Sequence, residues 1–386
     1  METASRLDGI GEYYFSTKLQ EISEMNKGEV QVINLGIGSP DMPPHPDVIN
    51  TLNQESAKLN VHGYQSYKGA EALRVACSKW YKEWYQVELD PGKEILPLIG
   101  SKEGIMHICM TYLNKGDKAL IPDPGYPTYS SAVKLASGTC MPYKLEEENN
   151  WDINFEELEQ QDLTGVKLMW VNYPQMPTGI RGSDDLFKRI VGFGIKHNIL
   201  ICHDNPYSFI LNDHPRSMLS VNGAKDIVIE LNSLSKSHNM AGWRVGFLAG
   251  NQQRIEEVLR FKSNMDSGMF LPLQLAAANA LSLGKEWFEQ VNEVYVKRKM
   301  KAIELLDLLK CTYTKDQVGL FVWAKIPATY KDGFQLSDEV LYKSKVFITP
   351  GGIFGDAGNG YVRVSLCSPE ASYVSAIERI KSTTSI

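Results

Sequence analysis

A lysine in the middle of the chain stands where an amine could react beside a phosphate group. Lys236 follows an apolar run, and the hydroxyls of Ser233 and Ser235 precede it closely. Arg244 adds a guanidinium eight residues later. A lysine amine can form an imine with a carbonyl compound, and hydroxyl and guanidinium groups donate hydrogen bonds to phosphate oxygens. The spacing therefore fits imine chemistry, but a solvated loop lysine with a structural arginine would have the same spacing.

A carboxylate and a phenol follow another apolar run. Asp204 comes directly after ILICH (199–203), and Tyr207 lies three residues later. In a parallel α/β sheet, ligands bind at the carboxyl ends of the strands, and a buried acid there needs a cationic partner. A protonated pyridine nitrogen is such a partner for Asp204, and Tyr207 can hydrogen-bond a phenolic oxygen. A helix cap at Asp204 and a core position for Tyr207 are the alternatives.

A third segment could bind phosphate. Gly100, Ser101 and Lys102 follow the run ILPLI (95–99) and precede an apolar helical pattern. Backbone amides at a helix N-terminus attract anions, and the adjacent hydroxyl and amine strengthen that attraction. A plain strand-to-helix turn is the alternative, because Gly and Ser are ordinary turn residues.

Short apolar runs that alternate with helical patterns position these residues. The runs expected to be strands are 95–99, 118–122, 166–171, 199–203, 227–231 and 245–249. They are apolar throughout, which is typical of strands covered on both faces. Ser183 can cap a crossover helix from Asp184 to His197. The pattern predicts an α/β domain with a largely parallel sheet.

After about residue 285 the pattern changes. A long helix carries apolar residues every three to four positions. Strands are expected at 320–326, 345–350 and 361–366, before a final helix that reaches about Ser382. We expect a large domain of residues 50–284 and a smaller α+β domain of residues 1–49 with 285–386. The chain has no long linker, so the two domains are expected to pack closely and share a site.

Composition narrows the possible functions. The net charge of −6 comes from interspersed acids and bases, with no basic run for nucleic acid or an anionic membrane. Six cysteines lie far apart, which favours reduced thiols over disulfides or a zinc site, and no metal is expected. The sequence has neither a secretory signal nor an apolar stretch long enough to cross a bilayer. The expected location is the cytoplasm.

Six motifs, in order along the chain, resemble those of a known enzyme family. They are NLGIGSPD (34–41), YQSYKGAEALR (64–74), DPGYPTY (123–129), YPQMPTG (173–179), SLSKSHNMAGWRVGF (233–247) and GYVRVSL (360–366). Each motif is weak alone, but their common order and spacing resemble the class I and II aminotransferases, which are pyridoxal-phosphate enzymes of fold type I. This resemblance implies a mostly parallel seven-stranded sheet in the large domain.

The resemblance also implies a role for individual residues. Lys236 matches the Schiff-base lysine, Asp204 the partner of the pyridine nitrogen, and Tyr207 the partner of the phenolic oxygen. The positions that match contacts to the phosphate or the ring of pyridoxal 5′-phosphate are Ser101, Lys102, Ser233, Arg244 and the stacking aromatic Tyr126.

Three further matches concern the substrate and the partner subunit. Arg363 matches the guanidinium that grips the substrate α-carboxylate, although a structural salt bridge would explain its apolar neighbours equally well. Gly38 matches the backbone that closes over the substrate. Tyr64 matches a tyrosine donated to the phosphate of the neighbouring subunit, which implies a homodimer with shared active sites.

One position departs from the family pattern. Met176 stands before PTG, where the family usually has an asparagine that donates to the cofactor's phenolic oxygen. A thioether cannot donate a hydrogen bond. We therefore expect an altered pKa of the imine at Lys236, with Asn172 or Gln175 as possible substitute donors.

The resemblance implies ping-pong transfer of an amino group between an L-amino acid and a 2-oxo acid. The main alternative is a C–S β-lyase similar to cystathionine β-lyase, because such enzymes share the cofactor residues. The stretch RLDGIGEYYFSTKLQEI (6–22) is similar to the branch that includes aspartate and LL-diaminopimelate aminotransferases, which favours transamination. A non-catalytic regulator is disfavoured, because Lys236 is retained and no DNA-binding extension precedes residue 34.

Overall fold

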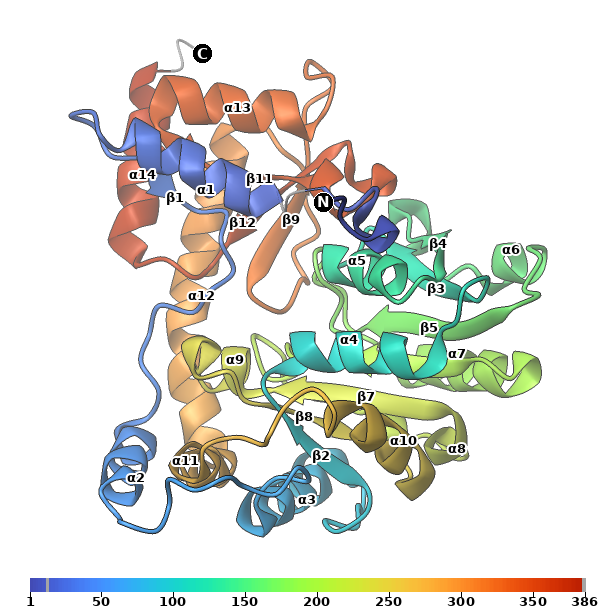
Figure 1. The fold of residues 1–386 in the computed structure, drawn as a ribbon. Coiled ribbons are helices and arrows are strands. Elements are labelled where there is room, and N and C mark those ends of the chain that lie inside the picture. Colours follow the sequence, from blue (N-terminus) through green and yellow to red (C-terminus); the bar gives the residue numbers. More distant parts are fainter. Residues whose placement is uncertain (12–13, 384–386) are drawn as a thin grey trace.

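The computed structural model describes residues 1–11 and 14–383, and Figure 1 shows their arrangement. Glu12 and Tyr13, which belong to the N-terminal stretch noted above, lie outside the described residues. The described elements form a large sheet covered by helices, with a smaller sheet beside it (Figure 1). None of the described helices combines the length and apolar composition needed to cross a bilayer.

The large sheet has seven strands in the order β2-β8-β7-β6-β5-β3-β4. Its strands are β2 (Ile95–Leu98), β3 (Lys118–Asp123), β4 (Thr139–Lys144), β5 (Val166–Asn172), β6 (Leu200–Asp204), β7 (Val228–Ser233) and β8 (Gly246–Ala249). The pairs from β7 through β4 are parallel, and β8 runs antiparallel to both of its neighbours. The predicted α/β fold with a mostly parallel sheet is therefore confirmed.

The prediction missed strand β4 at the sheet edge. Its sequence TCMPYK is partly exposed and contains Pro142, so it lacks the continuous apolar pattern of the inner strands. Parallel strands are joined by crossover helices, and Ser183 caps one of them as predicted, because its hydroxyl accepts a hydrogen bond from the Leu186 amide.

Helices cover the sheet on both faces (Figure 1). In this part of the chain they are α2 (Pro46–Ser56), α3 (Glu71–Tyr85), α4 (Ser101–Tyr112), α5 (Pro127–Leu135), α6 (Phe155–Glu159), α7 (Asp184–His197), α8 (Ala224–Ile227), α9 (Leu234–Ser237), α10 (Gln252–Lys262) and α11 (Leu271–Leu281). Two large clusters of buried apolar side chains pack against this sheet, and one of them continues into the smaller part of the structure.

The smaller part contains a three-stranded antiparallel sheet and one short parallel pair. The sheet has the order β11-β12-β9, from β9 (Phe321–Lys325), β11 (Thr349–Pro350) and β12 (Tyr361–Ser365), and β1 (Ile33–Asn34) pairs with β10 (Val346–Phe347). The single strand predicted over 345–350 is thus two short strands in different sheets. The domain boundaries at residues 49/50 and 284/285 stay a prediction.

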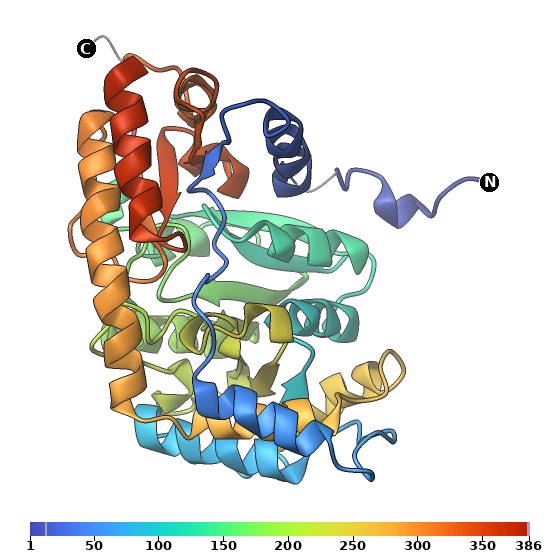
Figure 2. The same cartoon turned by 90° about the vertical axis from the view of Figure 1, so that its left-hand side faces the viewer.

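Helix α12 (Lys285–Leu308) runs along the whole molecule and joins the two parts of the structure (Figure 2). At its far end it packs beside the last helix, α14 (Glu370–Thr383). Both helices were expected from the sequence.

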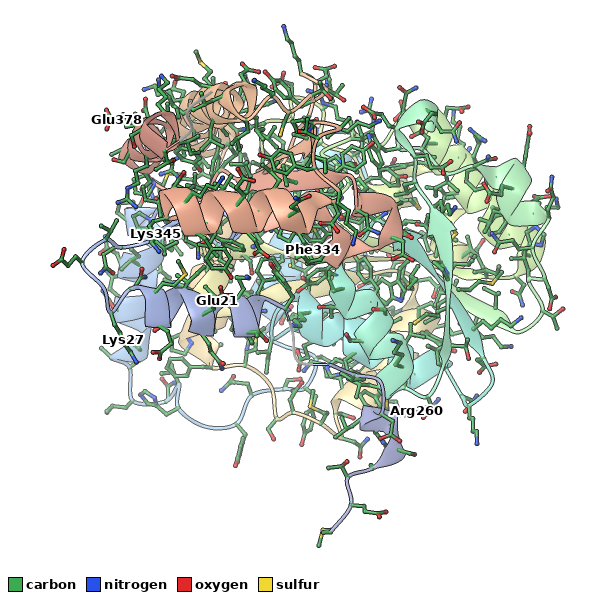
Figure 3. The ribbon with its side chains drawn as sticks, turned by 90° about the horizontal axis from the view of Figure 1, so that it is seen from above. Glu21, Lys27, Arg260, Phe334, Lys345 and Glu378 are labelled. Carbon is green, nitrogen blue, oxygen red and sulfur yellow. The ribbon has the colours of Figure 1, made fainter. Side chains whose placement is uncertain are left out.

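The N-terminal helix α1 (Tyr14–Met25) lies against α13 (Gly333–Ser344), as Figure 3 shows from above. Lys18 is ion-paired with Asp338 at 3.3 Å, and the ring of Tyr14 meets the edge of Phe334 at 6.0 Å between centroids. These contacts fix which face of α1 points toward α13 and which face remains available for other contacts.

Candidate active site

A cavity of about 480 Å³ lies where the two parts of the structure meet, at the carboxyl ends of the parallel strands. It is lined by ten of the eleven residues to which the sequence assigns a role in the site: Gly38, Ser101, Lys102, Tyr126, Asp204, Tyr207, Ser233, Lys236, Arg244 and Arg363. Residues from distant parts of the chain meet here because most of them follow the end of a strand, Arg244 directly precedes β8, and Arg363 lies on the smaller sheet.

Lys236 reaches into the cavity from the short helix α9, which begins directly after β7. The hydroxyl of Ser233 accepts a hydrogen bond from the Ser235 amide and starts this helix. The Lys236 amine donates to the Gly38 carbonyl oxygen at 2.5 Å. Burial lowers the pKa of Lys236 from its ordinary value, and the positive charges of Arg363 and Arg244 act in the same direction. The amine is therefore closer to its neutral, nucleophilic form than an exposed lysine.

Asp204 ends strand β6 and is almost completely buried. Its Oδ2 accepts a hydrogen bond from the Tyr129 hydroxyl at 2.8 Å, whereas Oδ1 has no hydrogen-bond partner among the described residues. Burial raises the pKa of Asp204 to about 6, although the Tyr129 hydrogen bond opposes that shift. A buried carboxylate oxygen without a partner is costly, so this position suits a cationic group on a ligand.

The start of α4 and Arg244 form an anion site. Gly100 has a φ of +82°, and a Cβ atom there would collide with the Arg244 guanidinium, so glycine is required. Arg244 also donates to the Ser235 hydroxyl at 3.3 Å. Burial and the charge of Arg244 lower the pKa of Lys102. Several positive groups thus surround a helix N-terminus, which favours a phosphate.

Arg363 lies on the opposite wall of the cavity, on β12. Its Nη2 donates to the Gly36 carbonyl oxygen at 2.9 Å, and its guanidinium packs on the rings of Phe321 and Phe354, at 3.8 and 4.6 Å from their centroids.

Met176 is in direct contact with this arginine. Its sulfur lies 3.3 Å from Arg363 Nη1, and its side chain is buried. Both suggested substitute donors make hydrogen bonds to the backbone: the Asn172 amide donates to the Asp204 carbonyl oxygen at 2.6 Å, and the Gln175 amide donates to the Pro124 carbonyl oxygen at 2.9 Å. Both amide groups are therefore engaged with backbone carbonyl oxygens.

Tyr64 is the one predicted site residue outside the cavity. It is 94% exposed and lines a separate surface pocket with His62 and Phe270. Within a single chain the structure does not bring Tyr64 to Lys236.

Sequence reasoning missed the residues that support the predicted ones. Tyr129 stands in a quoted motif, but only the structure shows its hydroxyl on Asp204. Its ring stacks on Trp170 at 5.0 Å, which holds the hydroxyl in place. Nothing in the sequence distinguished Phe321 and Phe354 from other apolar residues as contacts of Arg363.

One cluster outside the cavity has residue types that bind metals. Oxygen and nitrogen atoms of Glu103, His107 and Asp266 lie within 4.8 Å of one another. The Lys262 amine, however, lies 2.8 Å from Asp266 and places a positive charge beside that carboxylate. We interpret this group as a partly buried polar network between α4 and the segment after α10.

The cavity has the groups that pyridoxal phosphate requires. The amine of Lys236 would react with its carbonyl group, and the anion site at the helix N-terminus would bind its phosphate. The buried carboxylate oxygen of Asp204, which has no partner among the described residues, would pair with its protonated pyridine nitrogen. Fold and site together therefore define a fold type I pyridoxal-phosphate enzyme.

Comparison with known proteins identifies the family. A family model described as aminotransferase class I and II matches residues 30–380. The LL-diaminopimelate aminotransferase of Halothermothrix orenii is 39% identical, and the match covers 99% of each chain. The apo-BacF structure from Bacillus subtilis is 34% identical with a TM-score of 0.95, covering 100% of this chain and 99% of that one. A mutant aspartate aminotransferase from Thermus thermophilus, 20% identical and fully covered with a TM-score of 0.92, supports the fold alone.

The chain belongs to the class I and II aminotransferases. It is a pyridoxal-phosphate-dependent aminotransferase, so the predicted family, cofactor and reaction type are confirmed. The C–S lyase alternative gains no support from these relatives.

Proposed function

We propose that the cavity around Lys236 and Asp204 is where this chain exchanges an amino group between an L-amino acid and a 2-oxo acid. The observation that carries the proposal is that Lys236 and Asp204 line one cavity, and that Oδ1 of Asp204 has no hydrogen-bond partner among the described residues. When bound, pyridoxal phosphate supplies an electron-withdrawing ring that stabilises negative charge at the substrate Cα.

The chain's own residues supply positioning and proton transfer. Arg363 binds the substrate carboxylate through its planar guanidinium and orients the Cα–H bond. Lys236, with its lowered pKa, removes the Cα proton and holds it on Nζ until it is redelivered. Asp204 keeps a negative charge at the far end of the site, and Tyr126 and Tyr207 border the cavity between the two ends.

Absorbance spectra of the cofactor-loaded protein test this proposal. Each of a panel of L-amino acids, including L-glutamate, L-aspartate and L-cystathionine, is added in turn. Conversion of the bound cofactor to its amine form, with one equivalent of 2-oxo acid, and reversal by a 2-oxo acid are expected. Continuous release of pyruvate and ammonia from cystathionine, with an unchanged spectrum, would contradict it.

We also propose that the enzyme is a cytoplasmic homodimer in which each active site borrows Tyr64 from the other subunit. Tyr64 and Leu59 are more than 90% exposed, and Phe270, which lines the same surface pocket as Tyr64, is 41% exposed. Large exposed apolar side chains gathered in one region favour a protein interface. The six cysteines are unpaired, in keeping with a reducing compartment.

Mixed dimers test the sharing of Tyr64. Tyr64→Phe should weaken cofactor binding by about tenfold, the loss expected for a hydrogen bond to a charged group. When this variant is mixed with a Lys236→Ala variant, half of the mixed dimer's sites should regain both residues. Activity titrated against pyridoxal phosphate should then show a component with wild-type affinity. If mixing restores no such component, Tyr64 does not act across subunits.

Met176→Asn should change the pH at which the bound cofactor's absorption band titrates. An amide donor near the phenolic oxygen stabilises the ionised oxygen, so we expect the transition to move to lower pH. Met176→Leu is the matched control, because it keeps the apolar volume and also lacks a donor. Equal transitions for Met176→Asn and wild type would show that this position does not influence the titration.

A further inference from the structure

We propose that His203 is a positioning residue for the reaction, because its ring carries a fixed positive charge beside Asp204 and helps that carboxylate to stay ionised. The proposal rests on the proposed function, in which the Asp204 carboxylate pairs with a protonated pyridine nitrogen. His203 is completely buried and does not line the cavity, so it acts on the reaction through Asp204 and not by contact with a substrate.

The hydrogen-bond partners of the His203 ring define its protonation state. Nδ1 lies 2.8 Å from Oε2 of Glu230, and Nε2 lies 3.0 Å from the backbone carbonyl oxygen of Tyr173. A carbonyl oxygen can only accept a hydrogen bond, so Nε2 must carry a proton. An ionised Glu230 requires a proton on Nδ1 as well. Because a neutral imidazole has a single N–H, the ring beside an ionised Glu230 is an imidazolium ion.

The surroundings of Glu230 show that it is ionised. Its carboxylate oxygens accept hydrogen bonds from the Tyr81 hydroxyl at 2.7 Å, the Ser217 hydroxyl at 2.9 Å and the Met218 amide at 3.0 Å. These neighbours all donate, whereas a protonated carboxyl group would need an acceptor for its own proton. His203 and Glu230 therefore form an ion pair in which both side chains are 0% exposed.

The ion pair is oriented with its positive member next to Asp204. His203 and Asp204 are consecutive residues of β6, and their side chains point to opposite faces of the sheet. Glu230 is the partner of His203 in the register of β6 and β7, so the negative member lies on the neighbouring strand. Burial raises the pKa of Asp204 to about 6, and after the Tyr129 hydrogen bond the charge of His203 is the strongest influence that lowers it. Without the imidazolium, Asp204 would lose its charge at a higher pH.

Structural stabilisation alone does not account for this pair. Moving two charges out of water costs free energy, and a buried ion pair is often no more stabilising than apolar side chains of the same volume. The ring of His203 also meets the ring of Phe187 on α7, at 5.3 Å between centroids, which would suit an apolar residue. The low dielectric that makes buried charges costly also lengthens their reach. The pair thus supplies a charge beside a carboxylate that the reaction uses.

The other titratable groups that the structure describes near Asp204 and the ion pair do not supply this charge. They are Tyr129 on α5, Tyr173 after β5, Tyr207 after β6, Lys236 on α9, and Tyr81 and Tyr85 on α3. Burial raises the pKa of each of these tyrosines, so they stay neutral. Burial lowers the pKa of Lys236, and its amine is used to bind the cofactor.

Nitrogen NMR of the cofactor-free protein, prepared with ¹⁵N-labelled histidine, tests the charge directly. A His203→Gln variant assigns the signals of His203 by their loss. We expect both ring nitrogens of His203 to be protonated at about pH 8.5, about two units above the ordinary pKa of histidine. A single protonated nitrogen would overturn the inference, whatever the activity of the enzyme.

Urea unfolding of the cofactor-free protein measures the effect on Asp204. The gain in free energy of unfolding from Asp204→Asn is compared in the wild type and in His203→Gln. Loss of the imidazolium leaves Glu230 uncompensated and raises the pKa of Asp204, so ionising Asp204 at about pH 8 costs more. We expect the gain to grow by about a factor of ten in the unfolding equilibrium constant, which corresponds to about 1.4 kcal/mol.

The double variant His203→Gln/Glu230→Gln separates charge from packing. Glutamine at residue 230 has nearly the shape of glutamate but no charge, so it removes the uncompensated negative charge. The Asp204→Asn gain should therefore fall to a value between those of the wild type and His203→Gln. If His203→Gln alone does not fold, the gain in the double variant must still exceed that in the wild type. A double variant with the full effect of the single one, or no effect of either, would overturn the inference.

The cofactor-loaded enzyme shows whether this charge matters for the reaction. With the amino donor that reacts fastest in the spectral panel, His203→Gln should lower kcat at about pH 7 about tenfold and change KM less than about twofold, since Arg363 is untouched. The double variant should regain part of the loss. Phe187→Leu is the matched control, because it loosens the packing of the His203 ring without removing a charge, and should leave kcat and KM unchanged. Equal kcat values for His203→Gln and the wild type would overturn the inference, whereas a wild type that transaminates no amino acid would contradict the proposed function itself.

Discussion

Lys236→Ala is expected to lower kcat for transamination by about 10⁴-fold, because in the proposed mechanism it removes both the covalent anchor and the base that moves the Cα proton. Borohydride reduction followed by peptide mass analysis should attach the cofactor to the peptide containing residue 236 in the wild type and not in the variant. A small amine such as methylamine should restore part of the lost rate, since it can replace the missing base.

The control for this prediction is Lys144→Ala, an exposed lysine outside the cavity, which should change neither kcat nor the labelled peptide. Substitution at residue 236 should not destabilise the fold, because a buried amine with a lowered pKa costs free energy in the folded state. Labelling of a different lysine in the wild type would contradict the assignment of Lys236.

Asp204→Asn is expected to have the second-largest effect. Asparagine has nearly the same shape but carries no charge, so it cannot hold a protonated pyridine nitrogen. We expect a fall in kcat/KM of about 10²- to 10³-fold, comparable to the loss of one preorganised electrostatic partner. The cofactor can be replaced by an analogue whose pyridine nitrogen is N-methylated and therefore permanently charged. This replacement should increase the activity of the variant more than that of the wild type.

The same substitution should stabilise the protein without cofactor. Burial raises the pKa of Asp204 in the folded state to about 6 from an ordinary 3.8, so the folded state binds the proton more tightly than the unfolded state. The cost of ionisation is absent below pH 4, grows between pH 4 and pH 6, and is complete above pH 6. Asp204→Asn should therefore raise the free energy of unfolding by up to about 3 kcal/mol at pH 7 and by little at pH 4.

Urea unfolding of the cofactor-free protein across this pH range measures the difference. Asp213→Asn, at an exposed position outside the cavity, should show no such pH-dependent gain. A stabilisation of Asp204→Asn that is equal at pH 4 and pH 7 would show that the raised pKa is not its cause.

The inner strands of the large sheet were predictable because burial on both faces leaves a continuous apolar run, as in VKLMWV before Asn172. The edge strand β4 was not, because half of its side chains meet solvent. The sequence also predicted that Asp204 and Lys236 lie at the same edge of the sheet, because each follows the end of an inner strand and parallel strands share a direction.

Contacts between distant residues could not be predicted in this way. The sulfur of Met176 on Arg363 depends on how the smaller part packs on the larger one. The hydroxyl of Tyr129 on Asp204 and the two rings around Arg363 depend on how separate elements within one part pack together. A pattern in one stretch of sequence carries no information about such packing. The predicted role of Tyr64 cannot be checked within one chain either, because it requires a second subunit.

The guanidinium of Arg363 is held between two phenylalanine rings and tied to the Gly36 carbonyl oxygen. A free arginine side chain loses about 2 kcal/mol of rotamer entropy when it becomes fixed. Here that loss has already occurred during folding, so the carboxylate meets a donor that hardly needs to be ordered. Binding of simple carboxylates should accordingly carry a smaller entropic penalty than binding at a mobile surface arginine, and loosening either ring should appear first as a less favourable binding entropy.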